Sequence, residues 1–249
     1  MVLPDLNYNF DRILLDRQDK EIEEGKGRIA GKYYPSEIPA CLRQTFYKFY
    51  NPKRVPATTL RVFEAGNMTH EWIKKMLELL VQEKQLHGEI ASLESERPFT
   101  IVIDHEEDIS IEGRFDNFLM LSNDRERYLI EVKSQKSLFY SNEYKKEHAI
   151  QTMPYIYVKR PCKGIFAYVD RATYETRFFP KDGDGLDYDK EIMSWIFTRT
   201  KLLNKYIVTH QMPPPEAKQI KDMNWMCNLC PWKVECDAAE EQNKKWVKA

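Results

Sequence analysis

The chain has 249 residues, of which 42% are hydrophobic and 31% charged, and its formal net charge at pH 7 is −1. This length allows one large domain, or one domain with an accessory cap, with a packed core. The balanced charge excludes a global electrostatic case for nucleic-acid binding. No apolar run reaches about 18 residues, so no transmembrane helix is expected. The mixed-charge start is unlike a secretory signal. We therefore expect a cytoplasmic protein with no membrane partner.

The spacing of apolar residues predicts an α+β fold with a central mixed sheet flanked by helices. Residues 1–33 form a polar N-terminal extension. Helical periodicity and turn residues predict helices over 37–50, 63–86, 143–157 and 188–207. Short β-like runs predict strands over 99–104, 109–121, 127–133, 164–170 and 174–180. Polar turns at 104–108 and 122–126 separate the first three strands, which makes them a meander.

Four of the five cysteines lie towards the two ends of the chain. Cys227, Cys230 and Cys236 form a C-x2-C-x5-C pattern, and Cys41 lies far upstream. Thiolates favour zinc or iron–sulfur clusters, and three of them leave a tetrahedral or cubane site one ligand short. Cys41 completes that site if the fold brings both ends together. Such a site fits a reduced compartment, and Cys162, outside the pattern, is predicted to be a small core residue.

Two carboxylates and a lysine lie on neighbouring predicted strands. Asp116 falls in the second strand of the meander, and Glu131 and Lys133 lie at the end of the third. Alternate side chains share a face of a strand, so Glu131 and Lys133 point the same way, and antiparallel pairing sets Asp116 beside them. Carboxylates bind Mg²⁺ or Mn²⁺, and a lysine can stabilise developing charge. The set suits phosphodiester hydrolysis; a solvent-facing charged strand end is the alternative.

Three side chains outside the meander are further candidates. His70 lies early in the helix predicted over 63–86, where it could be a Mn²⁺ ligand, although a lone histidine is more often structural. Gln151 and Tyr155 share one face of the next helix through their i, i+4 spacing. They could hold a phosphate or a stacked base. An ordinary surface glutamine and a core tyrosine are the alternative interpretation.

The stretch from Lys133 to Lys163 is locally basic, with seven lysines and arginines against two glutamates. Four tyrosines are interleaved with these charges, at positions 140, 144, 155 and 157. This pattern suits a groove for single-stranded nucleic acid, in which lysines contact phosphates and rings stack on bases. A plain solvated helix face explains the composition equally well.

Together, the motifs resemble the RecB-type PD-(D/E)xK nucleases, and more closely their iron–sulfur members. The segment 66–70, Asp116, the Glu131-Val-Lys133 motif and the segment 151–155 follow the order of that family's four motifs. The opening segment 34–43 and the closing cysteine pattern are similar to those of the CRISPR-associated Cas-four nucleases. The resemblance covers residues 34–236 and leaves 237–249 as a C-terminal tail. The strand before Asp116 lacks the Pro-Asp pair of the pattern, as it does in many relatives.

The resemblance implies a restriction-endonuclease-like core and a metal-dependent DNA exonuclease that acts on single strands or DNA ends. The implied ligands of Mn²⁺ or Mg²⁺ are His70, Asp116 and Glu131. The implied catalytic lysine is Lys133, and Gln151 and Tyr155 belong to a DNA-contacting motif. The implied ligands of a [4Fe–4S] cluster are Cys41, Cys227, Cys230 and Cys236. Because Cas-four members prepare new CRISPR spacers beside the Cas-one/Cas-two integrase, prespacer processing is the expected context.

Three other interpretations use the same residues. A housekeeping repair nuclease of the AddB/RecB type would need its helicase on a separate chain, because the Walker A pattern G-x4-G-K-S/T does not occur here. A catalytically silent DNA-end-binding scaffold with a structural cluster is disfavoured by the intact Asp116, Glu131 and Lys133. A zinc ribbon usually carries two C-x2-C knuckles, whereas this chain has one.

Overall fold

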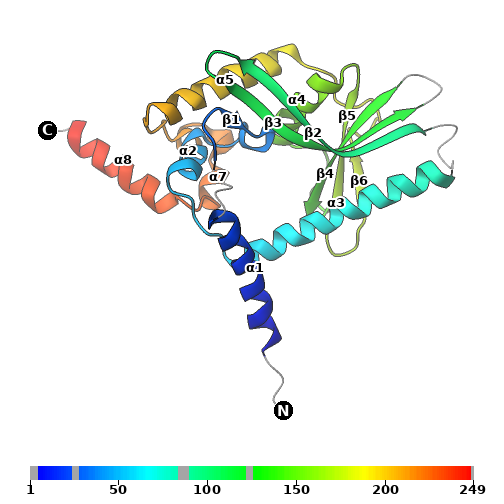
Figure 1. Ribbon diagram of the computed structural model, residues 1–249, viewed down its shortest axis with the longest axis horizontal. Coiled ribbons are helices and arrows are strands. Elements are labelled where there is room, and N and C mark those ends of the chain that lie inside the picture. The colour runs from blue at the N-terminus through cyan, green and yellow to red at the C-terminus, as the bar shows by residue number, and fades with distance from the viewer. Residues whose placement is uncertain (1–4, 24–27, 84–89, 122–125, 248–249) are drawn as a thin grey trace.

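The fold is known from a computed structural model, which describes residues 5–23, 28–83, 90–121 and 126–247. A six-stranded mixed sheet lies at its centre, with helices on both faces (Figure 1). This arrangement confirms the predicted α+β class. The strands are β1 Lys32–Tyr33, β2 Ile90–Asp104, β3 Ile109–Leu121, β4 Arg127–Gln135, β5 Lys163–Asp170 and β6 Thr176–Phe179. The α-helices are α1 Leu6–Glu23, α2 Leu42–Tyr50, α3 Ala57–Glu83, α4 Lys146–Lys159, α5 Lys190–Val208, α6 Glu216–Gln219, α7 Trp225–Asn228 and α8 Lys233–Val247.

Strand β3 is the strand around which the sheet is built. Along one edge it pairs antiparallel with β2 over nearly its whole length. Along the other edge it pairs in parallel with β1 near its start and antiparallel with β4 near its end. Strands β4 and β5 are parallel and connected by α4, while β5 and β6 form an antiparallel hairpin. The predicted meander of the first three long strands is therefore correct.

Different helices cover the two faces of the sheet. On one face, Ile73 and Leu77 of α3 pack with Val132 of β4 in a single buried cluster. On the other face, Met153 of α4 and Ile196 of α5 belong to a second cluster with residues of β2 and β3. Burying each such side chain contributes about 1.5–3 kcal/mol. The sheet is thus the middle layer of an α/β/α sandwich.

Several predicted bounds differ from the structure. Helix α2 begins at Leu42 and not at 37, because Cys41 has an extended backbone, with ψ at 126°. Strand β2 begins at Ile90, well before the predicted start at 99, because the long strand β3 offers a free edge to it. The turn predicted over 122–126 and the end of the helix predicted over 63–86 lie mostly outside the described residues.

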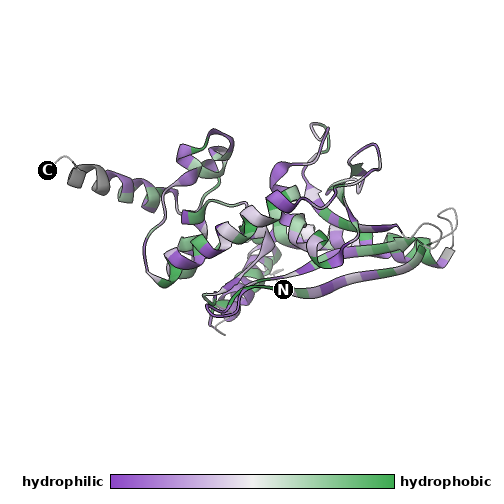
Figure 2. Cartoon of the chain, turned by 90° about the horizontal axis from the view of Figure 1, so that it is seen from above, coloured by the Kyte–Doolittle hydropathy of each residue, from purple (hydrophilic) through white to green (hydrophobic). Residues whose placement is uncertain are grey.

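The two terminal segments contain helices, α1 and α8, that the sequence patterns did not predict. Helix α1 lies within the predicted extension 1–33 and has no buried residue. It is tied to α3 by ion pairs of Arg17 with Glu64, at 3.2 Å, and of Asp11 with Arg61. Of the predicted tail 237–249, the described residues 237–247 continue helix α8, which projects away from the rest of the chain (Figure 1, Figure 2). None of the described helices combines the length and apolar content that crossing a bilayer requires.

Candidate metal site and cysteine pocket

A closed set of hydrogen bonds joins the predicted motif on β4 to helix α4. Glu131 and Lys133 alternate along β4 with Ile130 and Val132, which pack in the cluster beneath α3. Lys133 Nζ donates to Glu131 Oε1 at 2.7 Å and to Gln151 Oε1 at 3.0 Å. Gln151 Nε2 donates to the same Glu131 oxygen at 2.7 Å. Lys133 is therefore held in place by two acceptors, as a positioned ammonium group requires.

Asp116 connects this set to helix α3. Its Oδ2 accepts a hydrogen bond from the backbone N–H of Val132 at 2.7 Å, which fixes the carboxylate beside β4. Its Oδ1 lies 3.2 Å from His70 Nδ1. Burial acts to lower the pKa of His70, but the hydrogen bond to Asp116 and the charge of that group outweigh it and raise the pKa. The fold thus brings His70, Asp116, Glu131 and Lys133 into one cluster.

Glu131 is the acid of this cluster with the smallest exposure, at 2%. Burial, followed by the charge of Asp116, raises its pKa to about 7. Its Oε1 accepts both hydrogen bonds, whereas its buried Oε2 has no hydrogen-bond partner within the part of the chain that the structure describes. A buried oxygen without a partner is costly unless another group satisfies it. A cation would do so, and the imidazole and carboxylate donors fit Mn²⁺ or Mg²⁺.

Sequence reasoning missed one acidic residue at this place. The pairing of β2 with β3 sets Glu96 opposite Asp116. Ligand atoms of His70, Glu96 and Asp116 all lie within 4.8 Å of one another. Glu96 precedes the strand predicted from residue 99, so no period-two pattern marked it as a strand residue. The pairing register of β2 with β3 would have revealed that Glu96 lies opposite Asp116. That register is a property of the folded sheet and cannot be read from the local sequence.

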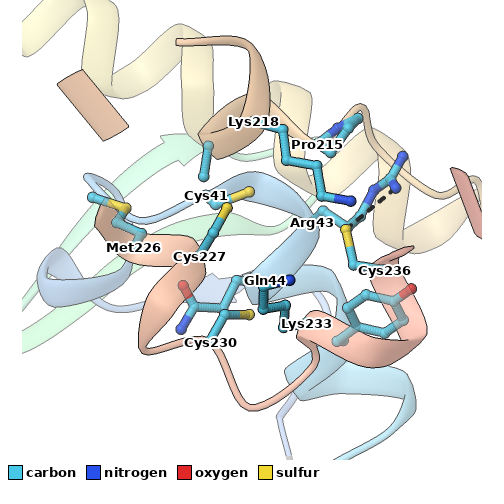
Figure 3. Close-up of a pocket in the computed structure, with 12 residues that line it drawn as sticks. Cys41, Arg43, Gln44, Pro215, Lys218, Met226, Cys227, Cys230, Lys233 and Cys236 are labelled. Carbon is cyan, nitrogen blue, oxygen red and sulfur yellow. Dashed lines mark hydrogen bonds between the residues drawn. The ribbon is translucent and has the colours of Figure 1, made fainter. Parts of the chain in front are cut away.

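The four predicted cysteine ligands line one pocket between the two ends of the chain (Figure 3). Cys41 directly precedes α2, Cys227 lies in α7, Cys230 follows it and Cys236 lies in α8. Burial, followed by neighbouring cysteine thiols, raises the pKa of Cys227. Cys162 lies elsewhere, beside a buried cluster of β3, β4 and α4, where burial raises its thiol pKa to about 11. This agrees with its prediction as a core residue.

Direct contacts beside the pocket also join the two ends. The rings of Tyr47 and Trp232 stack with centroids 6.2 Å apart. Arg43, which is 4% exposed, donates to Cys236 Sγ at 3.5 Å (Figure 3). It also donates to Glu240 Oε1 at 2.7 Å. The pocket is therefore supported by packing and hydrogen bonds that do not depend on a bound metal.

Comparisons with known proteins bear on the fold. No protein-family model and no curated protein matches this chain. The chain is similar to a solved structure described as "Crystal structure of SSO0001", with a TM-score of 0.57 and 19% sequence identity. The match covers 90% of this chain and 94% of that chain. At this level of identity the likeness shows a shared fold over almost the whole length.

Tyr155 does not face the site as a stacking ring. It is 5% exposed, and its ring meets Phe99 nearly edge-on with centroids 5.2 Å apart. Burial raises its pKa, while a hydrogen bond with Gln151 opposes that effect. The prediction that Tyr155 stacks on a base is wrong, because its ring fills the core. It instead supports Gln151, which lies one helical turn earlier.

The predicted groove with interleaved tyrosines is also mostly filled by packing. Tyr144 stacks on Phe166 with centroids 4.9 Å apart, and Tyr157 packs against aromatic rings of α5 and the segment before it. Lys159 Nζ donates to a carboxylate of β2 at 2.8 Å. Of the four tyrosines, Tyr140 alone is exposed, at 88%. Tyr155 is buried, Tyr144 and Tyr157 are partly covered by their packing partners, and Tyr140 is the exposed ring of this stretch.

Proposed function

We propose that this protein is a metal-dependent DNA exonuclease of the RecB-type PD-(D/E)xK class, which acts on single strands or DNA ends. One observation carries the proposal: Lys133 and Gln151 satisfy one oxygen of Glu131, while its other, buried oxygen lacks a partner among the described residues. Asp116 and His70 lie beside it. Carboxylates with an unsatisfied oxygen next to a fixed ammonium are what cation-assisted phosphodiester hydrolysis requires.

The chemistry of each residue follows from its contacts. A bound Mg²⁺ or Mn²⁺ supplies a Lewis acid and lowers the pKa of a coordinated water. His70, Asp116 and Glu131 would hold this cation. The hydrogen bond from the Val132 N–H to Asp116 Oδ2 fixes the orientation of the Asp116 carboxylate before the cation binds. Lys133 Nζ, fixed by its two acceptors, can donate to a phosphate oxygen as negative charge develops there.

The same proposal includes a [4Fe–4S] cluster on the four cysteines of the pocket. A single zinc ion with thiolates at about 2.3 Å would hold them roughly 3.8 Å apart. Among the described residues, no three of these sulfurs lie within 4.8 Å of one another. The proposed cluster rests on the convergence of the four cysteines at one pocket and on the resemblance of their sequence pattern to that of the iron–sulfur nucleases. The resemblance to Cas-four nucleases supports prespacer processing with the Cas-one/Cas-two integrase as the context.

Cleavage of end-labelled single-stranded DNA by anaerobically purified protein, with Mn²⁺ or Mg²⁺, tests the proposal. Asp116→Asn should lower the rate by about 10²–10³-fold, the loss typical of removing one electrostatic stabiliser. Glu112→Gln is the matched control, because this carboxylate lies on the same strand but pairs with Lys32 at 2.9 Å. A wild-type protein that degrades neither single strands nor frayed ends refutes the function. Equal cleavage rates for Asp116→Asn and wild type refute the assignment of Asp116 to the catalytic site.

A further inference from the structure

Glu96 occupies an irregular position in an otherwise regular strand pair. The residues on either side of it pair with Asn117 and Phe115, so Glu96 stands opposite Asp116. Its backbone φ is 56°, in the left-handed region that residues other than glycine rarely adopt. Such a conformation inside a strand persists only where the surrounding structure imposes it, and it is common at ligand sites.

The distances around Glu96 are close to those that a single small cation requires. Ligand atoms of His70, Glu96 and Asp116 lie within 4.8 Å of one another, and His70 Nδ1 lies 3.2 Å from Asp116 Oδ1. An octahedral cation with ligands at about 2.1 Å places neighbouring ligand atoms roughly 3.0 Å apart and opposite ones roughly 4.2 Å apart. Only small side-chain movements therefore separate the observed arrangement from a coordinated one.

A second, independent observation concerns the adjoining carboxylate on β4. Glu131 is 2% exposed, and its Oε2 has no hydrogen-bond partner in the described part of the chain. Asp116 accepts a hydrogen bond from the N–H of Val132, the residue after Glu131, at 2.7 Å, so Glu131 adjoins the group formed by His70, Glu96 and Asp116. Glu96 approaches this cluster from β2, whereas Glu131 approaches it from β4.

Glu96 is paired with a basic residue in this structure. Arg114 Nε lies 2.6 Å from Glu96 Oε2, and the side chain of Arg114 is 65% exposed. Arg114 lies two residues before Asp116 on β3, so the two side chains share a face. An ion pair this exposed to water is weak. A divalent cation bound by neighbouring groups can therefore compete with Arg114 for the Glu96 carboxylate.

We propose that Glu96 is a further protein ligand of the catalytic cation and that Arg114 restrains it in the metal-free protein. Cation binding breaks the Glu96–Arg114 ion pair and replaces it with a contact between Glu96 and the cation. The released guanidinium then lies beside the site, where it can bind a DNA phosphate in bidentate geometry. This inference rests on the proposed nuclease function, because it concerns the same cation.

Calorimetric titration with Mn²⁺ in the absence of DNA tests the assignment without relying on activity. Glu96→Gln should weaken Mn²⁺ binding by about 10–100-fold, the range seen when groups that support a metal site are replaced. Arg114→Gln should tighten it severalfold, because Glu96 loses its competing partner. Glu94→Gln is the matched control and should bind as wild type, since this carboxylate of β2 pairs with Lys159 at 2.8 Å.

Circular dichroism and thermal unfolding without divalent metal establish that each variant folds. Unchanged Mn²⁺ affinity in folded Glu96→Gln, with affinity lost in Asp116→Asn, overturns the role of Glu96 and leaves the proposed nuclease standing. Unchanged or weaker affinity in Arg114→Gln overturns the restraint by Arg114. Absence of Mn²⁺ and Mg²⁺ binding to the wild-type protein overturns the inference together with the nuclease function.

Discussion

The buried carboxyl of Glu131 should make the metal-free protein less stable as the pH rises from about 5 towards neutrality. Burial, followed by the charge of Asp116, raises its pKa from 4.5 to about 7. Between these values the folded chain binds more protons than the unfolded chain, so the free energy of unfolding falls with rising pH. The difference corresponds to about 3 kcal/mol, at about 1.36 kcal/mol for each pH unit. This contribution is complete below the unfolded pKa and lost as the pH passes the folded pKa.

The variant Glu131→Gln isolates this effect, because its amide does not titrate and its Oε1 can still accept from Lys133 and Gln151. Denaturant unfolding of both proteins without divalent metal should be compared from about pH 5 to about pH 8. The free energy of unfolding of wild type, minus that of the variant, should fall by about 2–3 kcal/mol over this range. Added Mn²⁺ should flatten the dependence, since a cation favours the ionised carboxylate. If the difference in unfolding free energy between wild type and Glu131→Gln does not change with pH, the pKa of Glu131 is not raised by folding and the prediction is wrong.

Five further substitutions test other parts of the structure. His70→Ala should lower the ratio of Mn²⁺- to Mg²⁺-supported cleavage, because imidazole suits Mn²⁺ better; an unchanged rate and ratio make His70 structural. Lys133→Ala should keep DNA and metal binding but slow single-turnover cleavage by about 10²–10³-fold, unlike a surface lysine. Iron analysis should find about four irons per chain in wild type and Cys162→Ser, with marked loss in Cys41→Ser; stoichiometric zinc would contradict the cluster. Trp232→Ala should lower the free energy of unfolding by about 3–5 kcal/mol, because this 5% exposed ring packs between the two ends of the chain. A loss below about 1 kcal/mol would show that this packing does not stabilise the fold.

Much of the fold could be predicted from local patterns. Strand β3 has the predicted bounds, because a long run of β-formers between polar turns carries its own signal. Glu131 and Lys133 share a strand face, as two-residue alternation predicts, whereas their contact with Gln151 depends on how α4 packs on the sheet. Helix α1 was missed, since it buries no residue and therefore has no apolar face to mark it.

Burial in the folded protein determines which of the candidate tyrosines could contact a nucleic acid. Tyr155 and Tyr140 occur in the same basic stretch, yet one is 5% exposed and the other 88% exposed. A tyrosine ring is apolar enough for a core and polar enough for a surface, so composition alone does not separate the two outcomes. The packing of α4 on the sheet separates them, because that packing determines which helix face is covered.

The sequence by itself determined the chemistry of the chain: four thiols at two ends, and a carboxylate followed by a Glu-x-Lys motif on consecutive strands. These are properties of residue type and short spacing, which local backbone periodicity converts into shared faces. Only the tertiary structure decided which distant groups meet. It set Glu96 opposite Asp116 and brought Cys41 to the pocket of Cys227. Such meetings depend on strand register and on the packing of layers, which arise from contacts between residues far apart in the chain.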